Sequence, residues 1–495
     1  MRRLCIEIAR ECSKIHDFIA GHTFEKKFIQ YILSQIDYPE LTYHLMPLEV
    51  LHWKDKYTII NTRDESFKAL SLPLTCGGLV KAKLTDDLNN CSGKILITPF
   101  PEDLDDAKFI YIKAFKNGAI GLIFIDPYPE TFRRIVITSR EDYTWSSSTP
   151  LSIPVVSVPK NYGEKLKKYY LNDEIEIHSD VEMKLSTSYN IIVNFENRSE
   201  KTVVISAHYD HWLCGFSDNC LGVGLSIELF REVIKWYRSD KCRKNIKLIL
   251  FTAEELGSPK YSTLYWAYGS QMYVKWLGNE VEHIEYVLNL DVIGRRPIVY
   301  TTSDVKMQLP DMLDVNIREP IPYFDSLNFE IMGVPTITIS SIDHYWDVYH
   351  SSNDNENNVE PQHVEKTLKL SMNILRHIIT STFNTEIYLK YARNELEKIG
   401  IGLSLEGTLS NYMRMRRLLS MYLVEYFMSE VSLTYVDSIF NYLQQMKYKS
   451  EVPLRVEKFG TGEVILEVST CKDRQNYINN IIAALSDCIR CSLKI

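Results

Sequence analysis

The chain has 495 residues, of which 45% are hydrophobic, and it carries 56 basic against 64 acidic residues for a net charge of −8. This length suits two to four domains, and the apolar fraction is sufficient for hydrophobic cores. The acidic balance, without any basic run, argues against nucleic acid or an anionic membrane surface as the main partner. Because no apolar run approaches the roughly 20 residues that span a bilayer, we also expect no membrane segment.

The first residues, MRRLCIEIARECSKIHDF, predict an amphipathic helix rather than a secretory signal, because Glu7, Arg10 and Glu11 interrupt the apolar positions. Without a secretory signal, the ten scattered cysteines are most simply interpreted as reduced thiols of a cytoplasmic protein. Cys488 and Cys491 form a Cys-x-x-Cys pair. No second cysteine pair completes a structural zinc site, so we expect neither a metal nor a redox role for it.

Four segments of different texture follow one another along the chain. Residues 1–62 open with helices, including one with a capping signal at Thr23, and continue into the strand-like TYHLMPLEVLHW. Residues 63–185 contain short apolar strands separated by turns. Residues 384–495 are mainly helical, interrupted by the strand-like GEVILEVS.

Between residues 186 and 383, apolar strands alternate with amphipathic helices. Strands are predicted at 202–207, 246–251, 286–291 and 335–341, and helices at 221–238, 262–278 and 360–380. This alternation indicates an α/β fold in which helices cover both faces of the sheet.

Acidic residues and histidines follow four of these strands. They are, in chain order, His208, Asp210, Asp218, Glu254, Glu255, Asp291 and His350. In open α/β sheets, sites form beyond the carboxyl ends of the strands, where these side chains would gather. Taken alone, each of these acidic or histidine-containing segments more often has a structural role than a metal-binding one. Gathered at one rim, however, the carboxylates would repel one another and raise each other's pKa values unless a cation neutralised them. The set therefore predicts a metal site.

The chemistry of a two-metal site suggests a role for each of these residues. Two divalent ions about 3.5–4 Å apart need a bridging carboxylate, terminal ligands and a shared water. Five side chains fit as ligands: His208, Asp218, Glu255, Asp291 and His350. Glu254 is then free to act as the general base for the water. We expect the Asp210 carboxylate to accept the second N–H of His208 and fix its tautomer.

Five motifs carry a resemblance to a known family. AHYDH, SDNCLGVG, FTAEELG, NLDVIG and YHSSND, between residues 205 and 354, resemble in the same order the motifs of the co-catalytic zinc peptidases. That family includes leucyl aminopeptidases, glutamate carboxypeptidase and the transferrin receptor. The resemblance implies one metal on His208 and Asp291 and another on Glu255 and His350, with Asp218 bridging. It also implies Glu254 as the general base, with zinc as the default metal and cobalt or manganese as alternatives.

The resemblance further implies a mixed, mostly parallel sheet and a division into domains. Residues 1–62 and 186–383 correspond to the catalytic domain. Residues 63–185 look like an inserted, β-rich protease-associated domain. Residues 384–495 are similar in placement to a helical dimerisation domain, which makes a homodimer through this region a candidate.

Some residues near the motifs have less direct roles. Asp354 matches an acidic position that supports His350, and Tyr349 matches a tyrosine that hydrogen-bonds the oxyanion in the carboxypeptidase branch. Two neighbouring histidines, His211 and His344, are not expected to be metal ligands, and Cys214 and Cys220 are interpreted as loop or helix-packing thiols. An aromatic insertion, SPKYSTLYWA at 258–267, either lines the substrate pocket or packs at the surface.

The favoured function is an exopeptidase acting on peptide substrates, most commonly an aminopeptidase in this family. The alternative enzyme is a carboxypeptidase or dipeptidase of the glutamate carboxypeptidase type, whose substrate carboxylate would need Arg295 and Arg296. A non-enzymatic receptor-like protein and a one-metal, glutaminyl-cyclase-like transferase are the remaining candidates. The retained ligands and base count against the receptor, and His208 together with Asp291 favours two metals.

Overall fold

The computed structural model describes residues 4–384, except 142, 144, 198, 238–243, 310–314 and 319, together with 386, 454–456 and 466–468. Most of the predicted helical region at 384–495 therefore lies outside the described residues. Within it, β15 (Leu454–Val456) pairs antiparallel with β16 (Leu466–Val468), and the latter lies in the segment GEVILEVS.

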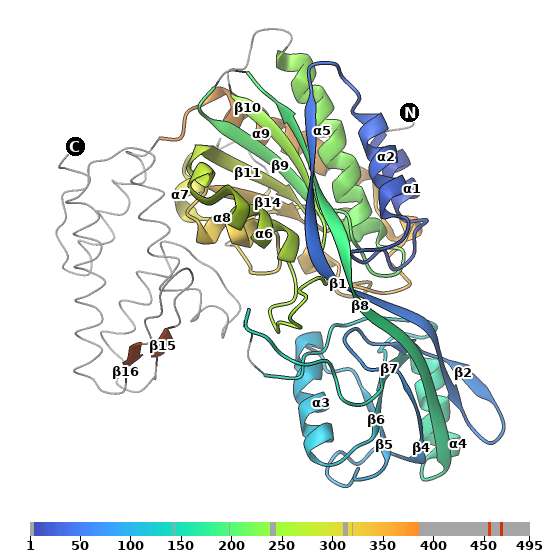
Figure 1. Ribbon diagram of the computed structural model, residues 1–495. Coiled ribbons are helices and arrows are strands. Elements are labelled where there is room, and N and C mark those ends of the chain that lie inside the picture. Colours follow the sequence, from blue (N-terminus) through green and yellow to red (C-terminus); the bar gives the residue numbers. More distant parts are fainter. Residues whose placement is uncertain are drawn as a thin grey trace.

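A mixed, mostly parallel sheet forms the centre of the upper lobe in Figure 1. Its four parallel strands are, in spatial order, β14 (Thr336–Ser340), β11 (Ile284–Leu290), β9 (Thr202–His208) and β10 (Asn245–Phe251). β12 (Ile298–Thr301) pairs antiparallel with β14, and β13 (Asn316–Arg318) extends that edge. The predicted fold class is confirmed, and each of the four predicted strands agrees with the structure to within two residues.

Helices cover both faces of this sheet (Figure 1). On one side lie α1 (Leu4–Cys12), α2 (Glu25–Gln35), α5 (Leu221–Tyr237) and α9 (Pro361–Thr380), and on the other α6 (Tyr268–Leu277) and α8 (Ser326–Ile331). The short α7 (Ser303–Lys306) follows β12. Every residue of β9 and β11 is buried, which explains why these strands read as continuous apolar runs.

Two predicted helix starts were wrong. α6 begins at Tyr268 rather than at 262, because the aromatic insertion before it is irregular. α2 has Phe24 as its N-cap, without a side-chain cap, so Thr23 does not cap it. At this end the Glu25 side chain is buried instead and accepts hydrogen bonds from Ser188 and Tyr209.

Two long paired strands connect the upper lobe with a lower lobe (Figure 1). β1 (Thr42–Asn61) and β8 (Glu174–Phe195) run antiparallel from the Thr42–Asn194 pair to the Asn61–Glu176 pair, and β8 also pairs with β10. β8 passes without a break through residues 185 and 186, where the sequence suggested a domain boundary.

The lower lobe has its own apolar clusters, and its strands continue the same sheet through β8, which pairs antiparallel with β4 (Gly78–Thr85). β4, β5 (Ile95–Pro99), β6 (Gly121–Ile125) and β7 (Val155–Val158) are parallel, with α3 (Ala107–Lys116) and α4 (Lys160–Tyr170) packed beside them. β2 (Ser66–Lys68) pairs with β1, and β3 (Leu70–Ser71) pairs with β7. Short 3-10 helices occupy Leu104–Asp106, Gly278–His283, Ile342–His344 and Glu356–Asn358. The resemblance of this lobe to a protease-associated domain stays a prediction.

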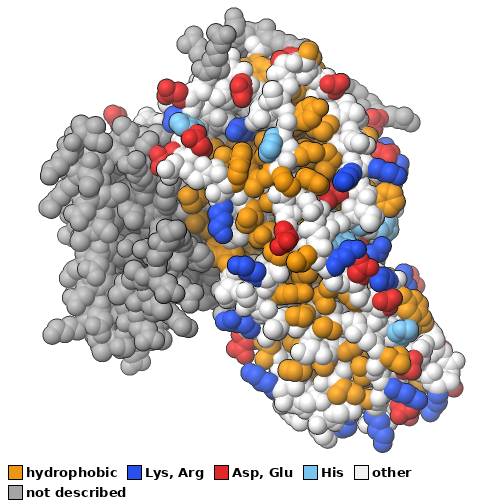
Figure 2. All heavy atoms as spheres, in the orientation of Figure 1, with side chains coloured by type: hydrophobic (Ala, Val, Ile, Leu, Met, Phe, Trp, Pro, Cys, Tyr) orange, Lys and Arg blue, Asp and Glu red, His pale blue; other side chains and the backbone are white. Residues whose placement is uncertain are grey.

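On the face drawn in Figure 2, basic and acidic side chains are interspersed over both lobes, with apolar side chains between them. Among the described residues, no helix has both the length and the apolar character to cross a membrane.

Candidate metal centre

The side chains predicted as ligands come together at the carboxyl ends of the parallel strands. His208 is the last residue of β9, and Asp291 directly follows β11. Glu254 and Glu255 lie in the turn after β10, and two longer loops supply the remaining two side chains. These are Asp218, in the short helical turn η2 (Phe216–Cys220) before α5, and His350, in the loop between β14 and α9. All six side chains are buried.

Asp218 lies between the two histidines. Its Oδ1 is 3.4 Å from Nε2 of His208, and its Oδ2 is 3.4 Å from Nε2 of His350. On one side, Asp291 Oδ1 is 3.4 Å from His208 Nε2, and on the other, Glu255 Oε2 is 3.0 Å from His350 Nε2. The result is two groups of three side chains that share Asp218, each with its ligand atoms within 4.8 Å of one another.

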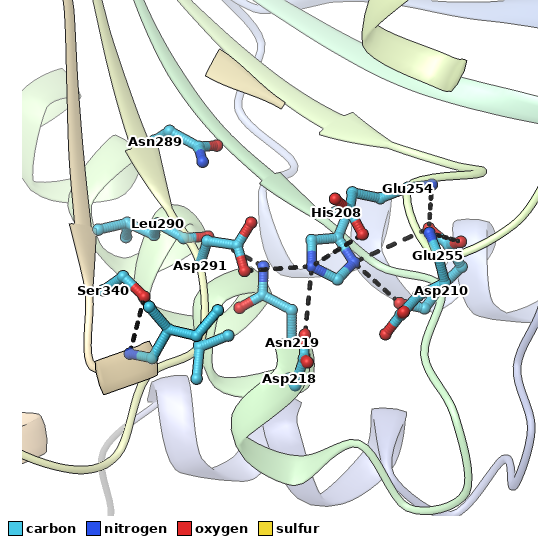
Figure 3. Close-up of polar contacts among 12 residues, drawn as sticks. His208, Asp210, Asp218, Asn219, Glu254, Glu255, Asn289, Leu290, Asp291 and Ser340 are labelled. Atoms are coloured by element: carbon cyan, nitrogen blue, oxygen red, sulfur yellow. Dashed lines mark hydrogen bonds and ion pairs between the residues drawn. The ribbon is translucent and has the colours of Figure 1, made fainter. Parts of the chain in front are cut away.

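Figure 3 shows this arrangement around His208. Asp291 and Asp218 approach the imidazole from one side, while Asp210 and the turn with Glu254 and Glu255 lie on the other. His208 and Asp291 lie 83 positions apart in the sequence, and they meet because the strands that carry them, β9 and β11, are neighbours in the sheet.

The electrostatics of the centre are unfavourable without a cation. Burial raises the pKa of Glu255, and the Asp218 charge adds to this while His350 opposes it, leaving a value of about 7. Burial, together with the charges of Asp291 and Glu255, holds the pKa of Glu254 well above its usual range. Burial lowers the pKa of His350, but Glu255 and Asp218 raise it more, to about 9. A divalent cation among these carboxylates would relieve their mutual repulsion and favour their ionised forms.

Unpaired polar atoms supply an independent test of whether a metal fits. His208 Nε2, Glu255 Oε1 and Asp291 Oδ2 are buried and have no hydrogen-bond partner among the described residues. Buried polar atoms are rarely left without partners, and imidazole nitrogen and carboxylate oxygen are ordinary zinc donors. The residues present therefore fit a metal centre.

Asp210 orients the site differently from the prediction. Nδ1 of His208 lies 2.9 Å from the backbone carbonyl of Asp210, whereas the Asp210 carboxylate is 3.9 Å from that nitrogen. The carboxylate instead accepts the backbone N–H groups of Glu254 and Glu255, at 3.1 and 3.0 Å. Asp210 thus fixes the His208 tautomer through its main chain and positions the glutamate turn through its side chain.

The prediction that Asp354 supports His350 was also wrong. The two Asp354 oxygens accept the backbone N–H groups of Ser217 and Asp218, at 2.8 and 3.2 Å. Nδ1 of His350 has no hydrogen-bond partner among the described residues. Asp354 therefore holds the loop of the central carboxylate, because these two buried amides take up both of its oxygens.

The lower lobe contributes residues that the sequence did not single out. Arg133 is 1% exposed, forms a 2.7 Å ion pair with Asp126, and donates to the carbonyls of Trp346, Asp347 and Tyr349. Arg134 also contacts this loop, because its backbone N–H donates to the His350 carbonyl at 2.9 Å. No sequence motif marks this arginine, which fastens the His350 loop to the lower lobe.

A cavity of about 610 Å³ opens onto Glu254 and onto four of the five predicted ligands, Asp218, Glu255, Asp291 and His350. Aromatic residues contribute much of its wall, namely Tyr143, Tyr265, Trp266, Tyr323, Trp346 and Tyr349. Two of them belong to the insertion at 258–267, which answers whether that segment lines the cavity. Its Trp266 donates to the Pro322 carbonyl and packs against Tyr143 of the lower lobe.

Tyr349 contacts the centre directly. Its ring stacks on that of His350, with 3.6 Å between ring centroids. Burial raises the pKa of Tyr349 well above its ordinary value, so its hydroxyl keeps its proton at neutral pH and is available as a donor.

Arg295 and Arg296 lie outside this cavity, in a separate hollow that also includes His344. Arg295 forms an ion pair with Asp347 at 2.5 Å and also donates to the His344 carbonyl. These partners hold its guanidinium away from the centre, so the expected substrate role of the pair is not supported. His344 likewise takes no part in the centre.

The fold and this site define a metallopeptidase. In agreement, residues 190–375 match the model of peptidase family M28. The resemblance to the co-catalytic zinc peptidases is thereby confirmed for this part of the chain. A search of curated protein sequences gives no match.

Solved structures of bacterial peptidases share the fold. A zinc aminopeptidase from Bacillus subtilis is 19% identical with a TM-score of 0.58, covering 77% of this chain and 97% of its own. A peptidase M28 precursor from Shewanella amazonensis is 15% identical with a TM-score of 0.59, covering 77% and 94%. An aminopeptidase from an Aneurinibacillus species is 18% identical with a TM-score of 0.52, covering 75% and 92%.

Proposed function

We propose that this protein is a two-zinc exopeptidase that removes residues from the amino terminus of peptides. The observation that carries the proposal is the position of Asp218, whose two oxygens are directed at two different histidines. His208 and Asp291 would hold one ion, and His350 and Glu255 the other. The zinc aminopeptidase of similar fold from Bacillus subtilis supports zinc as the metal.

The residues around the ions divide the chemistry between them. When bound, two zinc ions polarise the scissile carbonyl and acidify a water molecule. Glu254 lines the cavity and is not needed as a ligand, so it takes the proton of the attacking water and passes it to the departing amine. The Tyr349 hydroxyl donates a hydrogen bond to the developing oxyanion.

The charges on the cavity wall favour an amino-terminal over a carboxy-terminal substrate end. Glu102, Asp103 and Asp105 line the cavity and would attract a protonated amine. Arg133 is the one basic residue of the described lining apart from His350, and its guanidinium already binds Asp126 and backbone carbonyls. A substrate carboxylate would therefore find no free cation on the described wall. The aromatic lining further favours a large hydrophobic side chain on the residue that is removed.

A comparison of matched substrates tests this function. The zinc-loaded full-length chain should hydrolyse peptides with a free amino terminus and a blocked carboxyl terminus, and should not hydrolyse their N-acetylated counterparts. Preference for N-acetylated peptides with a free carboxylate would instead support the carboxypeptidase alternative. No hydrolysis of either set by fully metal-loaded protein would support a receptor-like role.

Two variants separate chemistry from metal binding. Glu254→Gln should lower kcat by about 10²–10⁴-fold and leave the metal content unchanged, since it removes a proton-transfer group rather than a ligand. His350→Ala should lower the metal content itself, measured by elemental analysis. Glu280→Gln, an exposed glutamate in the turn after α6, is the control and should match the wild type in both measurements.

A further inference from the structure

A second group of potential metal donors lies beside the centre but shares no residue with it. Cys12, His211 and Cys220 have their side-chain donor atoms within 4.8 Å of one another. They come from three segments: the end of α1, the loop after β9, and the end of η2. Each is 0% exposed, and both cysteines are free thiols.

The His211 side chain faces the Cys12 thiol, with which it interacts electrostatically. Neither Nδ1 nor Nε2 has a hydrogen-bond partner among the described residues, although both nitrogens are buried. Leaving a buried polar group unsatisfied is unfavourable, and a neutral imidazole has one donor and one acceptor to satisfy. The backbone N–H of His211 donates to the Phe18 carbonyl at 3.2 Å, which holds the main chain of this loop in place.

We propose that Cys12, His211 and Cys220 form a structural metal site that binds Zn²⁺. Two thiolates and one neutral imidazole balance the charge of a divalent zinc ion, so the buried site would be neutral when loaded. Zinc lies about 2.3 Å from thiolate sulfur and about 2.0–2.1 Å from imidazole nitrogen. Donor atoms already within 4.8 Å of one another need shift little to reach a common ion.

Binding is balanced by the loss of two protons. Both thiols give up a proton to solvent, and the imidazole binds through the nitrogen that carries none. The Cys220 thiol, which donates to the Cys214 carbonyl oxygen at 3.9 Å, would exchange this long bond for the metal.

The proposed ion would fasten the first helix to the loop of Asp218. Cys220 lies two residues after Asp218, and α1 already packs closely on α5, where a Cβ on Gly224 would lie 2.2 Å from the Cys5 carbonyl oxygen. The role of this site is thus to hold η2 in place beside the catalytic centre.

A disulfide between Cys12 and Cys220 is the competing use of the two thiols. It would consume both sulfur atoms as donors and leave the nitrogens of His211 as unsatisfied as before. A metal ion satisfies all three side chains at once, and for this reason the geometry favours it.

Cobalt substitution distinguishes this site from the catalytic centre, whose ligands are only nitrogen and oxygen. Full-length protein carrying Cys488→Ser and Cys491→Ser, to remove the terminal cysteine pair, is loaded with Co²⁺. We expect an intense near-ultraviolet sulfur-to-cobalt absorption. It should be lost in Cys12→Ser and in Cys220→Ser, together with one equivalent of metal per chain. Cys91→Ser, which alters a buried thiol of the lower lobe, is the control and should keep both.

Two results would overturn the proposal. One is the absence of this absorption, or its persistence unchanged in both cysteine variants. The other is a Cys12–Cys220 disulfide found by mass spectrometry in protein purified without reductant. If the variants do not fold, X-ray absorption of the zinc-loaded parent protein decides, since the site requires sulfur neighbours at about 2.3 Å from part of the zinc. The readout depends on sulfur ligation, so it is independent of peptidase activity.

Discussion

Replacing Arg133 with methionine tests whether the lower lobe holds the His350 loop. The substitution preserves much of the side-chain volume and removes the ion pair with Asp126 and the bonds to the carbonyls of residues 346, 347 and 349. Removing one partner of a buried ion pair typically destabilises a protein by about 3–5 kcal/mol, because the other charge stays buried. We expect a loss of this size in denaturant unfolding.

The same variant should show a distinct dependence on pH. Burial raises the pKa of Asp126 in the folded protein, and the Arg133 charge opposes this rise. Without Arg133, the pKa of Asp126 in the folded protein lies further above its value in the unfolded chain. The destabilisation is therefore largest at neutral pH, and it decreases at lower pH as Asp126 of the folded protein binds a proton. The difference in unfolding free energy between R133M and the wild type should therefore shrink from about pH 7 to about pH 5.

A double-mutant cycle makes this prediction refutable. In R133M/D126N the buried carboxylate is gone, so the double variant should recover about 1–3 kcal/mol relative to the sum of the single changes. Strict additivity, or a deficit that does not change with pH, would refute the idea that the charge of Asp126 is the cause. Metal content measured on the same samples reports whether the His350 loop has lost its position.

Three further variants test the parts of the site. Tyr349→Phe should lower kcat by about 10²-fold with little change in KM, because the hydroxyl acts on the transition state; an unchanged kcat would remove Tyr349 from the mechanism. Asp354→Asn should weaken metal binding about 10–100-fold in a chelator competition, because one backbone amide of the Asp218 loop loses its charged acceptor. Glu356→Gln, which alters a surface ion pair with Arg10, is the control and should leave metal binding unchanged. Trp266→Ala should lower kcat/KM about 10–100-fold for substrates with a large hydrophobic first residue, and by less for substrates whose first residue is alanine. Trp276→Ala, at an exposed tryptophan, is the control. Equal losses on both substrates would contradict a role of Trp266 in side-chain recognition.

The parts of the fold that could be predicted are those in which burial is total. β9 and β11 are buried along their whole length, so their apolar runs are continuous and their ends are evident. β1 and β8 are different, because they pass from one lobe to the other with mixed burial along their lengths. A change in sequence texture near residues 62 and 185 therefore does not reveal that β8 continues through the second of these positions.

The convergence of the polar side chains could be predicted, whereas their individual contacts could not. Topology alone brings the strand ends together, and this was sufficient for His208, Glu255 and Asp291. Asp210 lies two residues after His208 whether its backbone carbonyl or its side-chain carboxylate contacts the imidazole. The sequence therefore could not show which of the two groups makes this contact. Arg133 has no signal, because the carbonyls of the His350 loop that it binds lie more than 200 positions away in the chain. The cytoplasmic location and the homodimer through residues 384–495 stay predictions.

The attachment of the His350 loop to the lower lobe has a consequence for how such an enzyme can change over time. A lobe that supplies both a wall of the substrate cavity and the anchor of a ligand loop is not a detachable accessory. Deleting it would remove selectivity and catalytic competence in one step. Substitutions in its loops can alter substrate preference only if they preserve the contacts of Arg133 with the His350 loop. Substrate preference and activity are therefore expected to change together.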